Sequence, residues 1–263
     1  MSSTTPAIPA PSRPSDATGS PAPDRALSWA AACVLIVGSV LFLSGGRAHP
    51  AINAALGAGP DEFFRGFAEK VRHTHGWHAM HMLILVGPLC WAVAAPAVLD
   101  VIRPGARARI SAARSALLLS AALWAVAFVI DGFGAPVYAE AIASAATPDV
   151  ASGLLTSFQA DAVMMSRFGL VSWVAGGLGM VILGVLLLSP GARGMWRVAV
   201  GISGILIGIW PLAAALEGEY AGGPFVSRFW MANAAVVAMW YCALGTCALG
   251  RVPGGRLKSV PHP

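Results

Sequence analysis

The stretch His73-Thr-His-Gly-Trp-His-Ala-Met-His81 holds four of the six histidines of this 263-residue chain and runs directly into the apolar stretch Met82 to Leu99. At about 100° per residue of helix, His75, His78 and His81 follow one another around one side, and His73 falls on the opposite side. Ionisable groups at the mouth of a membrane helix indicate a functional site. The histidine stretch therefore predicts both the start of a membrane helix and the place of a site.

The composition is that of a membrane protein. The chain is 57% hydrophobic and 11% charged, with a mean hydropathy of +0.70, which is too apolar for a soluble domain of this length. Spanning a hydrocarbon core of about 30 Å takes roughly 20 residues of helix, since backbone groups in lipid must be satisfied within the segment. We therefore predict an all-α, polytopic bundle of six transmembrane helices, at about Leu27–Gly45, His78–Leu99, Ser115–Gly134, Phe168–Leu188, Arg197–Leu216 and Phe229–Leu249.

The charges predict how this bundle is oriented. Eleven of the 17 Lys and Arg residues lie in the N-terminal tail, between the second and third spans, between the fourth and fifth, and after the sixth. Nine of the twelve acids lie on the other side. The positive-inside rule then predicts a plasma-membrane protein with both termini cytoplasmic and the histidine stretch facing outward. The same distribution argues against a nucleic-acid partner, although the net charge is +5.

Composition shifts divide the chain into three parts. Residues 1–26 are rich in Ser, Pro, Ala and Thr and are predicted to form a disordered cytoplasmic tail, and residues 251–263 form a second one. Residues 27–250 form the transmembrane domain. A cleaved signal peptide is the alternative for the first span, but the tail before it is long and no A-x-A cleavage site follows before Pro50.

Two outer segments have the same build. Pro60-Asp61 opens an amphipathic segment that ends at Val71, which we expect to lie on the outer leaflet. Pro148-Asp149 opens another, ending near Met165.

This likeness points to an internal repeat of helical hairpins. Pro104-Gly-Ala-Arg107 returns as Pro190-Gly-Ala-Arg193, and Trp124 and Asp131 are matched by Trp210 and Glu217, all with a spacing of 86 residues. The hairpins ending at Gly134 and Gly218 are therefore predicted to superpose. In this register His81 takes the position of Arg167.

Six spans, a histidine-bearing second helix after an outer Pro-Asp segment, and Asp131-Gly132 closing the third span together resemble the uncharacterised six-helix integral membrane proteins of high-GC actinobacteria. The resemblance covers most of residues 27–250. It implies a fold class and no activity.

Polar side chains near the outer mouth form a candidate site. Its members are His75, His78, His81, Asp131, Arg167, Glu217 and Arg228. One interpretation is a ring of interfacial ion pairs between these arginines and acids, with the histidines reaching lipid headgroups. Another is a Zn²⁺ or Fe²⁺ site, in which His78 and His81 supply two imidazoles and Asp131 or Glu217 adds a carboxylate. We expect His78 and His81 to point into the bundle toward Asp131, because a histidine facing lipid costs free energy.

Other chemistry finds little support in the sequence. Apart from this divalent metal no cofactor is predicted, and haem is disfavoured because no other span contains a second histidine ligand. No catalytic residue is predicted, since the chain has no G-x-S-x-G elbow, phosphate-binding loop or dinucleotide fingerprint. The four cysteines lie in predicted spans without a CxxC spacing and are expected to be free thiols.

Two functional hypotheses remain open. The first is a non-enzymatic small transporter, sensor or accessory subunit with a polar outer vestibule. A repeat and spans interrupted by proline, here at Pro88 and Pro211, are typical of transporters. The alternative is a metal-binding membrane protein or membrane enzyme that uses the His/carboxylate cluster.

The sequence also suggests a helix-packing surface. The small-residue stripe of Ala234, Ala238, Cys242 and Thr246 recurs every fourth position. It should pack closely inside the bundle, against a second copy or against a membrane partner.

Overall fold

The computed structural model describes residues 25–50, 60–103, 105–189, 194–221 and 225–249, without the side chains of 25, 60, 212–221 and 225–232. Over these ranges the fold is all-α, and they contain no strand. In chain order the elements are α1 (Arg25–Ala48), α2 (Pro60–His73), α3 (Trp77–Ile102), α4 (Arg107–Val129), the π-helix η1 (Ile130–Gly134), α5 (Ala135–Ala143), α6 (Pro148–Leu188), α7 (Met195–Ala221) and α8 (Phe225–Leu249).

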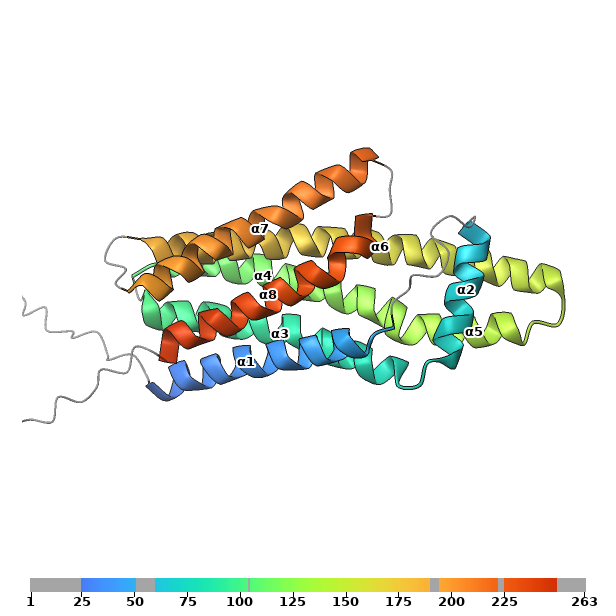
Figure 1. Ribbon diagram of the computed structural model, residues 1–263, viewed down its shortest axis with the longest axis horizontal. Helices are drawn as coiled ribbons and strands as arrows, with labels where there is room; N and C mark the ends of the chain where they lie inside the picture. The colour runs from blue at the N-terminus through green and yellow to red at the C-terminus, as the bar shows by residue number, and fades with distance from the viewer. Residues whose placement is uncertain (1–24, 51–59, 104, 190–193, 222–224, 250–263) are drawn as a thin grey trace, which may run out of the picture.

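The long helices form an elongated bundle. α1, α3, α4, α6, α7 and α8 run along the long axis, whereas the short α2 crosses one end of the bundle near α5 (Figure 1). Four helical segments are long and apolar enough to cross a membrane: Ala26–Ala48, Trp77–Ile102, Arg107–Ala143 and Pro148–Leu188. In α7 and α8 the apolar stretches within the described residues, Met195–Pro211 and Asn233–Leu249, are shorter. The first four predicted spans thus correspond to long apolar helices, and the fifth and sixth stay predictions.

Helix α6 is longer than the sequence led us to expect. A separate amphipathic piece ending near Met165 was predicted before a span beginning at Phe168, and this division was wrong: one helix runs from Pro148 to Leu188. No proline interrupts it after its first residue, and Arg167 is exposed, so its charge does not force a break. With 41 residues, α6 is about 60 Å long, twice the thickness of a hydrocarbon core.

The third predicted span also continues past its expected end. The hairpin was predicted to turn at Gly134, but α4 passes through the π-helix Ile130–Gly134 into α5 and stops only at Ala143. Pro136, the second residue of α5, has no N–H to donate to a carbonyl of the preceding η1 turn, and the helix nevertheless continues past it. The repeat stays a prediction, because the side chain of Glu217 is outside the described residues. The repeat also matches His81 with Arg167, but His81 is buried and Arg167 is exposed.

Glycines let the helices approach closely. A Cβ atom added to Gly38 of α1 would lie 2.4 Å from the Cβ atom of Cys90 on α3. One added to Gly177 of α6 would lie 2.4 Å from the carbonyl oxygen of Gly208 on α7. Small residues at such crossings replace side-chain bulk with backbone contact, which is how helices associate in lipid.

The small-residue stripe of α8 is partly inside this packing. Ala234 and Ala238 are buried, whereas Thr246 is exposed and its hydroxyl accepts a hydrogen bond from the indole of Trp196. Partner binding through the stripe stays a prediction. The four cysteines are free, as expected.

A second, smaller core lies at the end of the bundle that α2 crosses. We call it the outer cluster, after the side on which the predicted orientation puts this end; its buried members are Phe67, Ala68, Val71, Trp77, Met80, Ala135, Ala139 and Phe158. Two polar contacts fasten α2 above it: Arg72 Nε donates to Glu140 Oε2 at 3.3 Å, and Gln159 Nε2 donates to Asp61 Oδ1 at 2.7 Å. The apolar face of α2 is therefore buried against α3, α5 and α6.

The Gly177 crossing gives a test of this packing. Replacing Gly177 by Ala should lower the free energy of unfolding by about 1–3 kcal/mol, because the added methyl group must displace the backbone of α7. Gly169→Ala, in the same helix with nothing within 4 Å of the added atom, should be neutral or stabilising by up to about 1 kcal/mol. Thermal unfolding of both variants in detergent measures the difference. Equal stability would show that α6 and α7 do not touch at Gly177.

Candidate functional site

His81 lies in the first turns of α3, beneath the outer cluster. The chain reverses after α2 through Gly76, whose φ of +78° is the left-handed conformation that glycine adopts without strain. The side chain of His81 is only 1% exposed. Its Nδ1 donates to the carbonyl oxygen of Trp77 at 2.7 Å, and its Nε2 lies 3.0 Å from Oδ2 of Asp131. Both ring nitrogens of this buried imidazole are thus engaged.

Asp131 reaches His81 because of the π-helix between α4 and α5. A π-helical turn carries one residue more than an α-helical turn and often occurs at functional sites. A Cβ atom on the adjacent Gly132 would lie 2.7 Å from that of His81, so glycine lets the two helices meet here. The indole Nε1 of Trp77 also donates to the Asp131 carbonyl oxygen at 2.8 Å and fixes the backbone of the turn.

A third side chain, His49, completes the cluster from the end of α1. It follows the last residue of α1 directly, and its backbone N–H donates to Gly45 at 3.0 Å. Its Nδ1 lies 3.1 Å from the carbonyl oxygen of Pro50, and its ring centroid lies 5.0 Å from that of His81. Burial, and then the nearby His81, lower the pKa of His49 below its ordinary value, so its neutral form is favoured at neutral pH.

The three side chains form what we call the His/Asp cluster. One ligand atom from each of His49, His81 and Asp131 lies within 4.8 Å of the other two. A carbonyl oxygen can only accept a hydrogen bond, so the Nδ1 atoms of both histidines carry the hydrogen, an assignment made from the bonding network. In the neutral rings the lone pair is then on Nε2.

The carboxylate of Asp131 is not fully satisfied by hydrogen bonds from the described residues. Nε2 of His81 and Oδ2 of Asp131 are both acceptors if the ring is neutral and the acid ionised, so a proton or another cation must lie between them. The other carboxylate oxygen, Oδ1, is buried and has no hydrogen-bond partner among the described residues. A buried carboxylate oxygen without a partner is costly, and a bound cation would satisfy it.

The structure brings together two of the seven residues in the predicted polar site. His81 and Asp131 meet as expected, but His78 does not join them: it is exposed, and its ring packs on Phe133 with centroids 5.2 Å apart. The expected inward direction of His78 was therefore wrong. Histidines three residues apart differ by about 60° around a helix, and this separation turns His78 away from Asp131, so that its ring packs on Phe133 of η1 instead.

The remaining predicted residues lie elsewhere. His75 and Arg167 are exposed and outside the cluster, and the side chains of Glu217 and Arg228 fall outside the described residues. The predicted site omitted His49, although one signal was present: it follows the first span on the side predicted to hold the histidine stretch.

Known proteins give no further guide to this site. Neither the family models, nor the curated proteins, nor the solved structures compared with this chain match it. What the cluster does must therefore be inferred from its own geometry.

Because His81 is buried against Asp131 and His78 is exposed, we predict that the two histidines contribute differently to stability. His81→Ala should lower the free energy of unfolding of chelator-treated protein by about 1–3 kcal/mol, because it leaves Oδ2 of Asp131, like Oδ1, without a hydrogen-bond partner among the described residues. His78→Ala, one turn earlier on the exposed side, should change it by less than about 0.5 kcal/mol. Thermal unfolding in detergent compares them. If the two variants unfolded alike, the His81–Asp131 contact would not be part of the folded protein.

Proposed function

We propose that this chain is an integral membrane protein that binds a divalent transition metal, Zn²⁺ or Fe²⁺, at the His/Asp cluster. The observation that carries the proposal is the orientation of the two imidazoles. Each is fixed through Nδ1–H by a backbone carbonyl, and this second-shell bond is the one that metal-ligating histidines usually make. It leaves Nε2 of His49 and His81 as the nitrogen available to a metal beside Asp131.

The distances suit this assignment. Two atoms that share a tetrahedral zinc ion with bonds of about 2.0–2.1 Å lie about 3.3 Å apart. The 3.0 Å between Nε2 of His81 and Oδ2 of Asp131 is close to that value. The ligand atoms of all three residues lie within 4.8 Å of one another, so one side chain would shift inward slightly to share the ion. Of the three residues only His49 lies outside a helix, one position after the end of α1, so we assign this shift to its side chain.

The donor set narrows the choice of metal. Two imidazoles and one carboxylate suit Zn²⁺ or Fe²⁺ rather than the oxygen-rich sites of Ca²⁺ and Mg²⁺. Three protein ligands would leave at least one coordination position for a water molecule or another small ligand. A sensor, a metal-handling accessory subunit and a metal-dependent enzyme would each use such a site, and metal binding is the step they share.

The membrane setting places the cluster on the outer side of the proposed topology. The cluster lies where α1 ends and α3 begins, opposite the arginine-rich link between α3 and α4. With six spans and both termini cytoplasmic, the positive-inside rule puts His49, His81 and Asp131 at the outer face of the plasma membrane. The metal would then come from outside the cell.

Metal analysis tests the proposal. Protein purified without a polyhistidine tag and supplied with Zn²⁺ or Fe²⁺ should retain one equivalent of metal per chain after desalting. The His49→Ala, His81→Ala and Asp131→Ala variants should each lower the affinity at least about tenfold, because each removes one ligand. His75→Ala and His78→Ala serve as matched controls from the same histidine stretch and should bind like the original chain.

The outcomes are distinct. Loss of metal in His78→Ala but not in His49→Ala would move the site to the exposed histidines and overturn the assignment. A folded chain that retains neither metal would show that the cluster is a hydrogen-bonded strut between α1, α3 and η1.

Orientation can be tested separately. A cysteine introduced at Ser144, in the link between α5 and α6, should react with an impermeant thiol reagent in intact cells. A cysteine introduced at Ala106, in the arginine-rich link, should react only after the cells are opened, because the basic side is retained inside. Both cysteines are introduced into a variant whose four original cysteines are replaced by serine, and this variant alone gives the background of labelling. The reverse labelling pattern would place the His/Asp cluster in the cytoplasm.

A further inference from the structure

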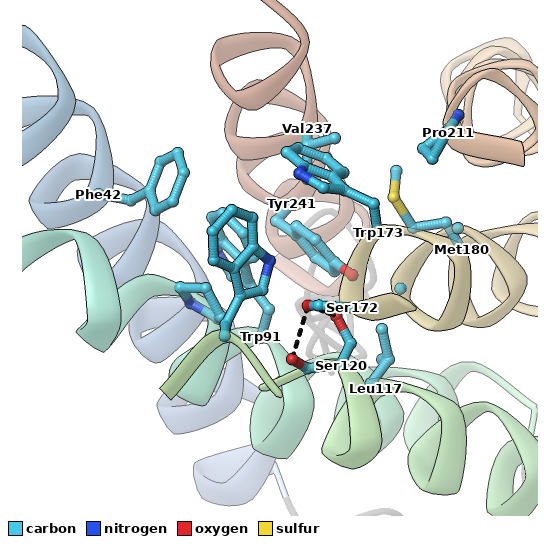
Figure 2. Close-up of a pocket in the computed structure, with 14 residues that line it drawn as sticks. Phe42, Trp91, Leu117, Ser120, Ser172, Trp173, Met180, Pro211, Val237 and Tyr241 are labelled. Atoms are coloured by element: carbon cyan, nitrogen blue, oxygen red, sulfur yellow. Dashed lines mark hydrogen bonds between the residues drawn. The ribbon is translucent and has the colours of Figure 1, made fainter. Parts of the chain in front are cut away.

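A small cavity lies inside the bundle, away from the His/Asp cluster. Its volume is about 30 Å³, and residues of α1, α3, α4, α6, α7 and α8 line it. Its walls are mainly apolar, with Trp91, Trp124 and Trp173 among them. Three hydroxyl groups also face it: those of Ser120, Ser172 and Tyr241 (Figure 2). We call it the hydroxyl cavity.

Two of these hydroxyls bond to each other and the third does not. Ser172 donates to the carbonyl oxygen of Ser120 at 2.7 Å, and the two serine Oγ atoms lie 3.1 Å apart. Tyr241 is only 2% exposed, and among the described residues its hydroxyl has no hydrogen-bond partner. The close-up shows this hydroxyl directed toward the serine pair (Figure 2). A buried phenol normally has a partner, so this one calls for a molecule in the cavity.

Two prolines add further unmet groups. Pro88 of α3 and Pro211 of α7 both line the cavity. Each lacks the N–H that would bond the carbonyl four residues earlier, which leaves the carbonyl groups of Ile84 and Ile207 without their usual helical donor. Inside a membrane, ordered water is one of the means by which such freed carbonyls are satisfied.

The size of the cavity defines what it can hold. A buried water needs about 10–15 Å³ of volume measured in this way, so the hydroxyl cavity has room for two. Gly176 keeps one wall open, since a Cβ atom there would lie 2.8 Å from Oγ of Ser120. A lipid chain or an aromatic ligand would require the tryptophan walls to move.

We propose that the hydroxyl cavity is a binding site for two water molecules. One accepts the hydrogen of Tyr241, and together they donate to the free lone pairs of Ser120 and Ser172. The waters join α8 to the α4–α6 pair at the level where the ladders of α3 and α7 are interrupted. The site is independent of metal at the His/Asp cluster.

Water-edited solid-state NMR of the full chain in vesicles of deuterated phospholipid tests this. Magnetisation should pass from water to Tyr241 and Ser172 within the bundle. It should not reach Ser39, a matched control on α1 that is fully buried and already donates to Leu35 at 2.8 Å while accepting from Trp91 at 3.0 Å. In Tyr241→Phe the transfer to Ser172 should fall toward the level of Ser39, because one water loses its donor.

Two results would overturn the proposal. One is a water transfer to Ser172 in the original chain no larger than that to Ser39, which would show a dry cavity. The other is transfer from lipid acyl protons, in a matched sample with protonated lipid, stronger than that from water, which would show that a lipid chain fills it. Both readings are made on the original chain, so they hold even if Tyr241→Phe does not fold.

Discussion

A polar group taken out of water must find a partner, and the contact between His81 and Asp131 is where this constraint acts on the fold. The imidazole is almost fully buried, and the carboxylate side chain is only 15% exposed. Among the described residues Asp131 is the only side chain that bonds Nε2 of His81, so α3 and the α4–η1 helix must meet with these two side chains facing each other. The register of α3 against α4 and η1 follows from this requirement.

Trp77 extends the same constraint outward. Its carbonyl group holds Nδ1 of His81, its indole holds the backbone of Asp131, and its ring lies 4.7 Å from that of His81 and 5.9 Å from that of Phe67. One side chain therefore belongs both to the outer cluster and to the His/Asp cluster. The packing of α2 and the geometry of the candidate ligands are mechanically connected through it.

The sequence allowed the helical class and the meeting of His81 with Asp131 to be predicted, because both follow from local composition and from the cost of burying polar groups. It did not allow His49 to be placed, since the approach of that ring depends on where α1 stops and how closely Gly45 lies on α3. The uninterrupted α6 and the π-helix were missed for a related reason. Pro136, Ser166 and Arg167 resemble helix ends in sequence, but the surrounding packing and the exposure of Arg167 allow the helices to continue.

The His/Asp cluster unites three segments that leave the ribosome at different times. His81 follows His49 by 32 residues, and Asp131 follows His81 by a further 50. The cluster cannot form until α4 and its π-helical extension have been synthesised and have packed against α3, since contacts distant in sequence require the chain between them to close first. During synthesis the imidazole of His81 is therefore made before the carboxylate of Asp131 that it bonds in the folded protein. An early folding intermediate of this chain, ending before η1, would hold His81 without its acidic partner.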